Sequence, residues 1–323
     1  MKALCVFSGG LDSILAAELI RAQGIDVLAL FFETPFFKAI NARKSANFLE
    51  LPFKIVGITK PHLKIVRNPL HGYGRNMNPC IDCHALMFRV AGEMLAEEGA
   101  DFVITGEVLG QRPMSQNKYA LDLVAAESNI PGLLLRPLSA RLLQSTIPEE
   151  KGWINRSHLM DFQGRTRKPQ IALAERFGIK EYPSPAGGCL LTEKVFSRRL
   201  QDLFDYQKMY GINEIELLKY GRHFRLGCNS KVVVGRNKIE NQALLNLKDN
   251  RGCYLQTISV PGPVVLVYGD ISSTVIEVAA SVTAAYSDIK TGDMTFIKVV
   301  KNEQEYSIST LAVGKEKFRD YMI

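Results

Sequence analysis

A glycine-rich turn near the start of the sequence has the residue types that bind phosphate. Residues 8–13, Ser-Gly-Gly-Leu-Asp-Ser, follow a short apolar run, 3–7, that predicts a buried strand, and they precede a helical pattern of apolar residues. Paired glycines permit a sharp turn and let an anion approach backbone N–H groups closely. Those groups and the positive end of the helix dipole can hold a phosphate. The alternative is a purely structural turn.

Three cysteines are spaced for metal or sulfur chemistry. Cys80 and Cys83 form a CxxC pair, and Cys189 stands in a Pro/Gly-rich loop, 184–190, where a side chain is readily presented. A CxxC pair is compatible with half of a zinc site, a redox pair or two ligands of an iron–sulfur cluster. A four-cysteine zinc site needs a second CxxC, which the sequence lacks. The alternative at Gly187-Gly188-Cys189 is a plain turn with a buried thiol.

The glycine turn resembles the SGGxDS signature of the PP-loop ATP pyrophosphatases. It has no lysine at the position that a Walker A loop requires, so it does not predict a kinase-type γ-phosphate site. The resemblance implies that phosphate is bound by Ser8, Gly9, Gly10 and Ser13. It further implies that Asp12 lies near Mg²⁺ or orients ATP.

Two further segments resemble the tRNA thiouridine synthases of the ThiI and MnmA type. Asn78-Pro79-Cys80 followed by Cys83 resembles their NPC-x-x-C element, and residues 105–116 resemble a segment of the 4-thiouridine synthases. The resemblance covers roughly residues 1–200. It implies tRNA as partner, a sulfur donor such as a cysteine desulfurase, and ATP with Mg²⁺. Its candidates for binding ATP or the uridine are Thr105, Gly106, Glu107, Gly110, Gln111, Ser115 and Gln116.

By this resemblance, sulfur replaces a carbonyl oxygen of uridine. ATP adenylates the oxygen, pyrophosphate leaves into the glycine turn, and sulfur then displaces AMP. Sulfur arrives either as a persulfide on a cysteine of lowered pKa or as sulfide on the open iron of a [4Fe-4S] cluster. We favour the cluster, held by Cys80, Cys83 and Cys189, with a zinc site as a third alternative. The catalytic candidates are Asp12, Cys80 and Cys189.

Two other functions fit the same glycine turn. One is a PP-loop ligase or amidotransferase acting on a small molecule, which needs neither the three cysteines nor an RNA-binding domain. The other is an RNA-binding factor whose ATP site is regulatory, which predicts RNA affinity without sulfur transfer.

The elements that must position these residues alternate between strand and helix over the first 135 residues. Strands are predicted at 3–7, 27–32, 53–58, 102–105 and 133–135, and helices at 12–23, 39–50 and 84–98. This alternation predicts an α/β domain, a parallel sheet with helices on both faces, in which ligands bind at the carboxyl ends of the strands. Phe32, at the end of the second strand, is a candidate adenine contact; the alternative is a core residue.

A compact basic cluster at residues 163–168 precedes Pro169, the predicted first residue of a helix over 169–177. Its cations are candidate phosphate contacts for RNA, which position the nucleic acid without specifying its sequence. The alternative is a solvated surface. The candidates in the cluster are Arg165, Arg167 and Lys168, and further candidates elsewhere are Arg112 and Arg136.

From Gly221 onward the pattern changes to short strands around two helices, which predicts a smaller α+β domain. Residues 234–241 (VGRNKIEN) and 279–287 (AASVTAAYS) resemble two elements of the NFACT-R domain, an RNA-binding module. The RNA contacts implied are Arg222, His223, Arg225, Arg236 and Lys238. The predicted division is a PP-loop thiolation domain at 1–190, a helical linker at 191–220 with Thr192 capping a helix over 192–206, and an RNA-binding domain at 221–323.

Composition agrees with a globular protein that binds nucleic acid. Of the 323 residues 46% are apolar, and the net charge of +7 suits a polyanionic partner without proving one. No apolar run is long enough for a membrane span and no signal peptide is evident, so we expect no membrane association and a cytoplasmic location. Structural disulfides are not expected there. Cys5, Cys228 and Cys253 are expected to be structural.

Overall fold

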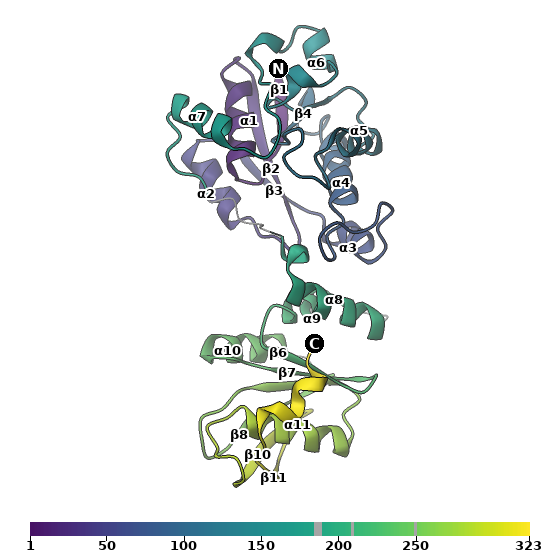
Figure 1. Cartoon of the computed structure of the whole chain (residues 1–323), viewed down its shortest axis with the longest axis vertical. Helices are drawn as coiled ribbons and strands as arrows, with labels where there is room; N and C mark the ends of the chain where they lie inside the picture. Colours follow the sequence, from purple (N-terminus) through teal and green to yellow (C-terminus); the bar gives the residue numbers. More distant parts are fainter. Residues whose placement is uncertain (184–188, 208–209, 249–250) are drawn as a thin grey trace. The chain divides into compact units, whose positions relative to one another are not determined.

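The computed structural model describes residues 1–183, 189–207, 210–248 and 251–323. The chain divides into two compact units, Met1–Thr192 and Glu193–Ile323 (Figure 1). Among the described residues, no helix has the length and apolar character needed to cross a bilayer.

The first unit is built on a parallel sheet with the strand order β3-β2-β1-β4-β5. Its strands are β1 (Lys2–Val6), β2 (Asp26–Glu33), β3 (Phe53–Gly57), β4 (Phe102–Thr105) and β5 (Leu134–Leu135). All paired strands run parallel, which confirms the predicted α/β class. The order reverses at β1, and ligands of such sheets bind at the carboxyl ends beside the reversal. The glycine turn after β1 and the 105–116 segment after β4 both start at this point.

Helices cover both faces of the sheet (Figure 1). One core contains Cys5 and Ile104 of the sheet together with α1 (Leu11–Arg21), α2 (Ile40–Phe48) and α7 (Lys168–Arg176). The core on the opposite face contains Leu4 and Val103 together with α4 (Cys80–Glu93) and α5 (Lys118–Glu127). Leu4 and Cys5 belong to different cores because successive strand residues point to opposite faces. Short elements complete the unit: α3 (Thr59–Arg67), α6 (Ile147–Glu150), η1 (Ala140–Leu142), η2 (Arg156–His158) and η3 (Leu190–Thr192).

Three helix starts differ from the sequence prediction. Helix α4 begins at Cys80, so the CxxC pair lies in its first turn and not ahead of it. Helix α7 begins at Lys168, which makes Pro169 its second residue. Helix α8 (Lys194–Tyr206) has Glu193 as its N-cap, so the predicted cap at Thr192 is wrong. The Thr192 hydroxyl instead donates to the Cys189 carbonyl at 2.7 Å, within the preceding 3₁₀ turn.

The second unit contains an antiparallel sheet with the order β11-β10-β8-β9-β7-β6, as expected for an α+β domain. Its strands are β6 (Arg222–Leu226), β7 (Ser230–Val234), β8 (Gly252–Thr257), β9 (Val265–Gly269), β10 (Met294–Lys301) and β11 (Gln304–Leu311). Helix α11 (Ser273–Ala285) packs on the face that carries Phe224 and Val232. Helices α9 (Ile212–Leu217) and α10 (Lys238–Leu247) pack on the opposite face, which carries Val233 and Leu266. A final 3₁₀ helix, η4 (Lys315–Tyr321), buries Phe318 in the α11 core.

Helix α8, from the predicted linker, is bonded to the sheet of the second unit. Asp202 accepts from Arg225 of β6 at 2.6 Å and from Lys231 of β7 at 2.9 Å. Burial alone would raise the pKa of Asp202, but the hydrogen bonds and charges of Arg225 and Lys231 lower it overall. Arg199 of α8 donates to two backbone carbonyls at the junction between α9 and β6, each at 2.8 Å.

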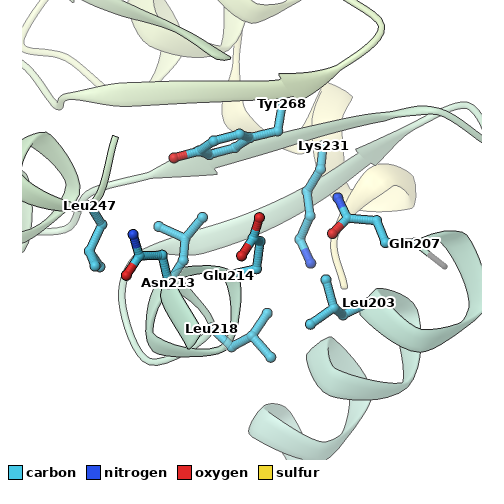
Figure 2. A pocket seen from close by; sticks show the side chains of 9 residues that line it. Leu203, Gln207, Asn213, Glu214, Leu218, Lys231, Leu247 and Tyr268 are labelled. Carbon is cyan, nitrogen blue, oxygen red and sulfur yellow. The ribbon is translucent and has the colours of Figure 1, made fainter. Parts of the chain in front are cut away.

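A small hollow lies beside Lys231, between helices α8 and α9 and the sheet (Figure 2). Leu203, Leu218 and Leu247 line its apolar side, and Tyr268 closes it from β9. The hollow has a volume of about 20 Å³, which accommodates one water molecule. It is therefore too small for a nucleotide.

Candidate active site

The glycine turn joins β1 to α1 in a geometry that suits anion binding. Gly9 has a φ of +75°, in the left-handed region that favours glycine. A Cβ on Gly9 would lie 2.5 Å from the Cα of Ala42, so close packing against α2 also requires glycine here. Helix α1 begins at Leu11 without a side-chain cap. Its first backbone N–H groups are therefore available to an anion.

The two serines of the turn have different surroundings. Ser13 is 4% exposed, and its hydroxyl donates to the Gly10 carbonyl at 2.9 Å. Ser8 is exposed; its hydroxyl oxygen accepts from the Gly10 N–H at 3.3 Å and lies 3.3 Å from the Ser13 oxygen. Ser8 can therefore turn toward a bound phosphate, whereas Ser13 stabilises the turn.

Asp12, in the first turn of α1, is held by side chains from two distant segments. Gln111 Nε2 donates to Asp12 Oδ2 at 2.8 Å, and Gln170 Nε2 donates to Gln111 Oε1 at 2.9 Å. Arg167 Nη2 lies 3.6 Å from the other carboxylate oxygen, Oδ1. That oxygen is buried and has no hydrogen-bond partner, so it can bind a ligand. Arg167, a candidate RNA contact from the sequence, thus lies at the glycine turn.

The segment 105–116 packs directly on the glycine turn. A Cβ on Gly106 would lie 2.5 Å from the backbone nitrogen of Ser13. Thr105 is buried at the end of β4, and Gly110 has a φ of +74°. Phe32 is 3% exposed and belongs to the core under α4, and its contact with adenine stays a prediction.

A buried carboxylate joins this segment to α4. Glu107 is 3% exposed; one oxygen lies 2.8 Å from His84 Nδ1, and the other accepts from Arg136 Nε at 2.8 Å. Burial would raise the pKa of Glu107, but Arg136 and His84 lower it overall, so the carboxylate is ionised. Glu107 therefore orients His84 and balances the charge of Arg136. Arg136 is 7% exposed, so the prediction that it contacts RNA is wrong.

Sequence reasoning missed His84 and Arg136 as members of this group. His84 lies four residues after Cys80, a spacing that places both on one side of a helix. Arg136 follows β5 directly, at the same edge of the sheet as the glycine turn. The spacing of Cys80 and His84 is informative only once the helix is known to begin at Cys80. The position of Arg136 is informative only once β5 is known to pair with β4.

Burial dominates the chemistry of the CxxC pair. Cys83 is buried, its sulfur lies 3.2 Å from His62 Nε2, and burial raises its pKa well above 9.0. The charges of Cys189 and Cys80 raise it further. Burial also raises the pKa of Cys80, against the opposing effects of Arg112 and Ser115. The persulfide route predicts a lowered pKa, and neither cysteine of the CxxC pair shows one.

Within the described parts of the chain, no three His, Cys, Asp or Glu side chains are grouped closely enough to hold one metal ion. Cys189 is described, whereas Gly187 and Gly188 of the predicted loop lie outside the described residues. A cluster distributes its thiolates over several irons and does not need the tight grouping of a zinc site.

The predicted RNA contacts fall into two groups. Arg165, Lys168 and Lys238 are exposed to solvent. Arg236 is exposed but forms an ion pair with Glu240. His223 is fully buried and bonded to the Tyr220 carbonyl, and Arg225 is paired with Asp202, so we withdraw these two as RNA contacts.

Two family models match separate parts of the chain. Residues 1–141 match the family described as thiamine biosynthesis protein (ThiI). Residues 221–322 match the NFACT protein RNA binding domain. The glycine turn, the CxxC pair and the 105–116 segment all lie in the first match.

The similar proteins are matched over part of their length. A tRNA-specific 2-thiouridylase MnmA from Karelsulcia muelleri (strain GWSS) is 27% identical over 178 residues, which are 51% of this chain and 46% of the relative. The MnmA of Sulfurimonas denitrificans is 32% identical over 121 residues, 33% of this chain and 35% of the relative. The chain therefore spans about half or less of the length of these curated relatives.

Solved structures give a weaker likeness. A crystal structure of a 4-thiouridine synthetase–RNA complex with bound ATP is 23% identical and covers 42% of this chain and 36% of its own, with a TM-score of 0.35. A TM-score this low does not establish a shared fold. The family matches therefore give two separate likenesses: residues 1–141 are similar to the ThiI family, and residues 221–322 are similar to the NFACT RNA-binding domain.

Proposed function

We propose that this protein uses ATP to activate a uridine of tRNA and replaces the carbonyl oxygen with sulfur. The supporting observation is that the segment 105–116 reaches both the glycine turn, which would bind ATP, and the CxxC pair, which would handle sulfur. Gln111 bonds to Asp12 at the glycine turn, and Ser115 is close enough to Cys80 of the CxxC pair to act on its pKa. The ThiI-type and MnmA-type relatives agree with this reaction class.

The first step of the proposed reaction is adenylation. The uridine oxygen attacks the α-phosphorus of ATP, a P–O bond forms, and pyrophosphate leaves. The N–H groups at the start of α1 and the Ser8 hydroxyl are arranged to bind the departing anion. Arg167 adds a positive charge beside the turn. Oδ1 of Asp12 has no hydrogen-bond partner among the described residues and lies 3.6 Å from Arg167 Nη2; it fits a ligand of Mg²⁺, which when bound would neutralise phosphate charge.

In the second step a sulfur nucleophile attacks the activated carbon and AMP leaves with the former uridine oxygen. The number and chemistry of Cys80, Cys83 and Cys189 suit three ligands of a [4Fe-4S] cluster. Such a cluster, when bound, would supply an iron with an open position for sulfide. The raised pKa values of Cys80 and Cys83 disfavour free thiolates there, and this weighs against a persulfide on the CxxC pair.

The test is a reaction of the purified protein with an unmodified tRNA transcript, ATP, Mg²⁺ and sulfide. Digestion of the tRNA and mass spectrometry should reveal a thionucleoside, with one AMP and one pyrophosphate per sulfur inserted. Cys80→Ala should abolish the thionucleoside, whereas Cys228→Ala, at an exposed cysteine of the second unit, should not. Pyrophosphate release without any thionucleoside would indicate a ligase. Binding of tRNA without either product would indicate a regulatory ATP site.

The sulfur carrier is tested by anaerobic purification and by iron and acid-labile sulfide analysis. We expect about four irons per chain in the wild type and in Cys228→Ala, and their loss in Cys189→Ala. Iron-free protein that still thiolates tRNA would refute the cluster and return the persulfide route to first place.

A further inference from the structure

Several cations of the second unit are neutralised by carboxylates. Arg225 and Lys231 share Asp202, and Arg236 is paired with Glu240. Lys219, Arg251 and Lys298 are paired with Glu216, Glu214 and Glu305, respectively. An anionic ligand gains little from a cation whose charge is already balanced, so these residues are poor candidates for an RNA site.

Two other cations lie over one aromatic ring, and a third, Arg319, follows one of them by four residues on η4. Arg222, at the start of β6, lies 5.1 Å from the ring centroid of Tyr286, and Lys315 Nζ lies 5.4 Å from it. Arg319 is close enough for its charge to lower the pKa of Tyr286, although burial raises that pKa overall. No carboxylate in the described parts of the chain lies within ion-pair distance of these three cations. None of the three is paired with a described carboxylate, although Glu316 and Asp320 stand on the same helix as Lys315 and Arg319.

The fold holds these groups in place. Tyr286 directly follows α11, and its ring packs 5.8 Å from the ring of Phe224 in the core. Lys315 and Arg319 both lie on η4, which is fixed by the buried Phe318. Cations over an aromatic face are stabilised by the ring quadrupole and lose part of their freedom. Arg222 and Lys315 are therefore held in place before any ligand binds.

We propose that Arg222, Lys315 and Arg319 form a binding site for the phosphate backbone of RNA, with Tyr286 as the platform that orders two of the cations. This inference rests on the proposed function only in naming tRNA as the RNA. Three cations without carboxylates suit an oxyanion, and the match to the NFACT RNA binding domain covers all four residues. Because the contacts are to phosphate, they position the RNA and do not read its bases.

The experiment measures binding of the full chain to two labelled tRNA transcripts of unrelated sequence over a series of salt concentrations. The plot of log affinity against log salt should lose about one unit of slope for each cation removed, as in Lys315→Gln and Arg319→Gln. The loss should be equal for both transcripts. Lys298→Gln is the matched control, because it changes the net charge equally but removes a cation already paired with Glu305. An equal effect in the control, or an effect on one transcript only, would overturn the proposal.

The role of the ring is tested separately. Tyr286→Phe keeps the aromatic face and should bind like wild type, whereas Tyr286→Leu should weaken binding although every cation remains. Equal weakening in both variants would refute the platform. Thermal melting confirms that each variant is folded. The binding assay needs neither ATP nor sulfur. If the wild type does not thiolate tRNA but Lys315→Gln still weakens RNA binding as expected, only the proposed function is refuted. A wild type that binds neither transcript would refute the site.

Discussion

The substitution Gly106→Ala tests whether the 105–116 segment fixes the glycine turn. The added Cβ would lie 2.5 Å from Ser13 N, 2.6 Å from the Asp12 carbonyl carbon and 2.7 Å from its oxygen. All three are backbone atoms, so no side-chain rotation can relieve the overlap. Overpacking of this kind costs about 1–3 kcal/mol. Either the turn keeps its place and the protein is destabilised, or the turn moves and the nucleotide site is distorted.

These two outcomes have measurable sizes. If the turn stays, the melting temperature should fall by about 2–4 °C per kcal/mol for a unit of this length. If the turn moves, ATP binding must restore it, and the same 1–3 kcal/mol lowers the affinity by roughly 5- to 150-fold. Isothermal titration with ATP measures the loss of affinity, and thermal melting of the same sample measures the loss of stability. The two free-energy changes together should equal the overpacking energy.

The matched control is Gly57→Ala at the end of β3. A Cβ there meets no atom within 4 Å, and Gly57 is not among the glycines of positive φ. Removing a glycine also reduces the entropy of the unfolded chain, so the control should be neutral or slightly stabilised. A Gly106→Ala protein that melts and binds ATP like wild type would refute the close packing of the two segments.

Three further predictions follow from buried groups. Glu107→Gln leaves the buried charge of Arg136 without its partner, so it should destabilise the protein by about 3–5 kcal/mol in urea unfolding. Because the folded-state pKa of Glu107 lies below 4.5, its stabilisation is present above that pH and lost on further acidification; the variant should show less of this loss. Lys231 has a folded-state pKa of about 8 against an ordinary 10.5, so the unfolded chain binds more protons between these values and stability should rise with pH there. Lys231→Met should remove that rise, and an unchanged pH dependence of urea unfolding would contradict the assignment. Iodoacetamide at mildly alkaline pH should modify exposed Cys228 well before buried Cys83, as followed by peptide mass spectrometry; modification of Cys83 as early as Cys228 would contradict its burial.

The parallel sheet could be predicted because its strands are short apolar runs separated by helical patterns. Elements whose polar residues are satisfied only by tertiary contacts were not predictable. Strand β6 contains His223 and Arg225, which suggest a surface segment until the Tyr220 carbonyl and Asp202 are known to bind them. Helix α3 was missed for a related reason: basic residues dominate it, and His62 is buried only because Phe36, Phe37 and Cys83 surround it.

The candidate site was predictable where its residues are contiguous in the sequence. The glycine turn and the CxxC pair are local motifs whose spacing carries the chemistry. The partners of Asp12 and Glu107 come from distant parts of the sequence: Gln111 lies 99 positions from Asp12, and Arg136 lies 29 positions from Glu107. Such contacts depend on how β1, β4 and α7 pack, and the sequence contains no local pattern for them.

Arginine residues illustrate why a charge count does not locate an RNA site. The net charge of +7 does not distinguish one exposed cation from another as a phosphate contact. The structure separates them by their partners. Arg136 balances Glu107, Arg225 balances Asp202, and Arg167 faces Asp12 at the nucleotide turn. An RNA phosphate must compete with those carboxylates. At Arg222 it would meet a cation that lies over the aromatic ring of Tyr286 and is not paired with a described carboxylate. The predicted RNA affinity of the second unit therefore depends on where carboxylates are missing, more than on where lysine and arginine are abundant.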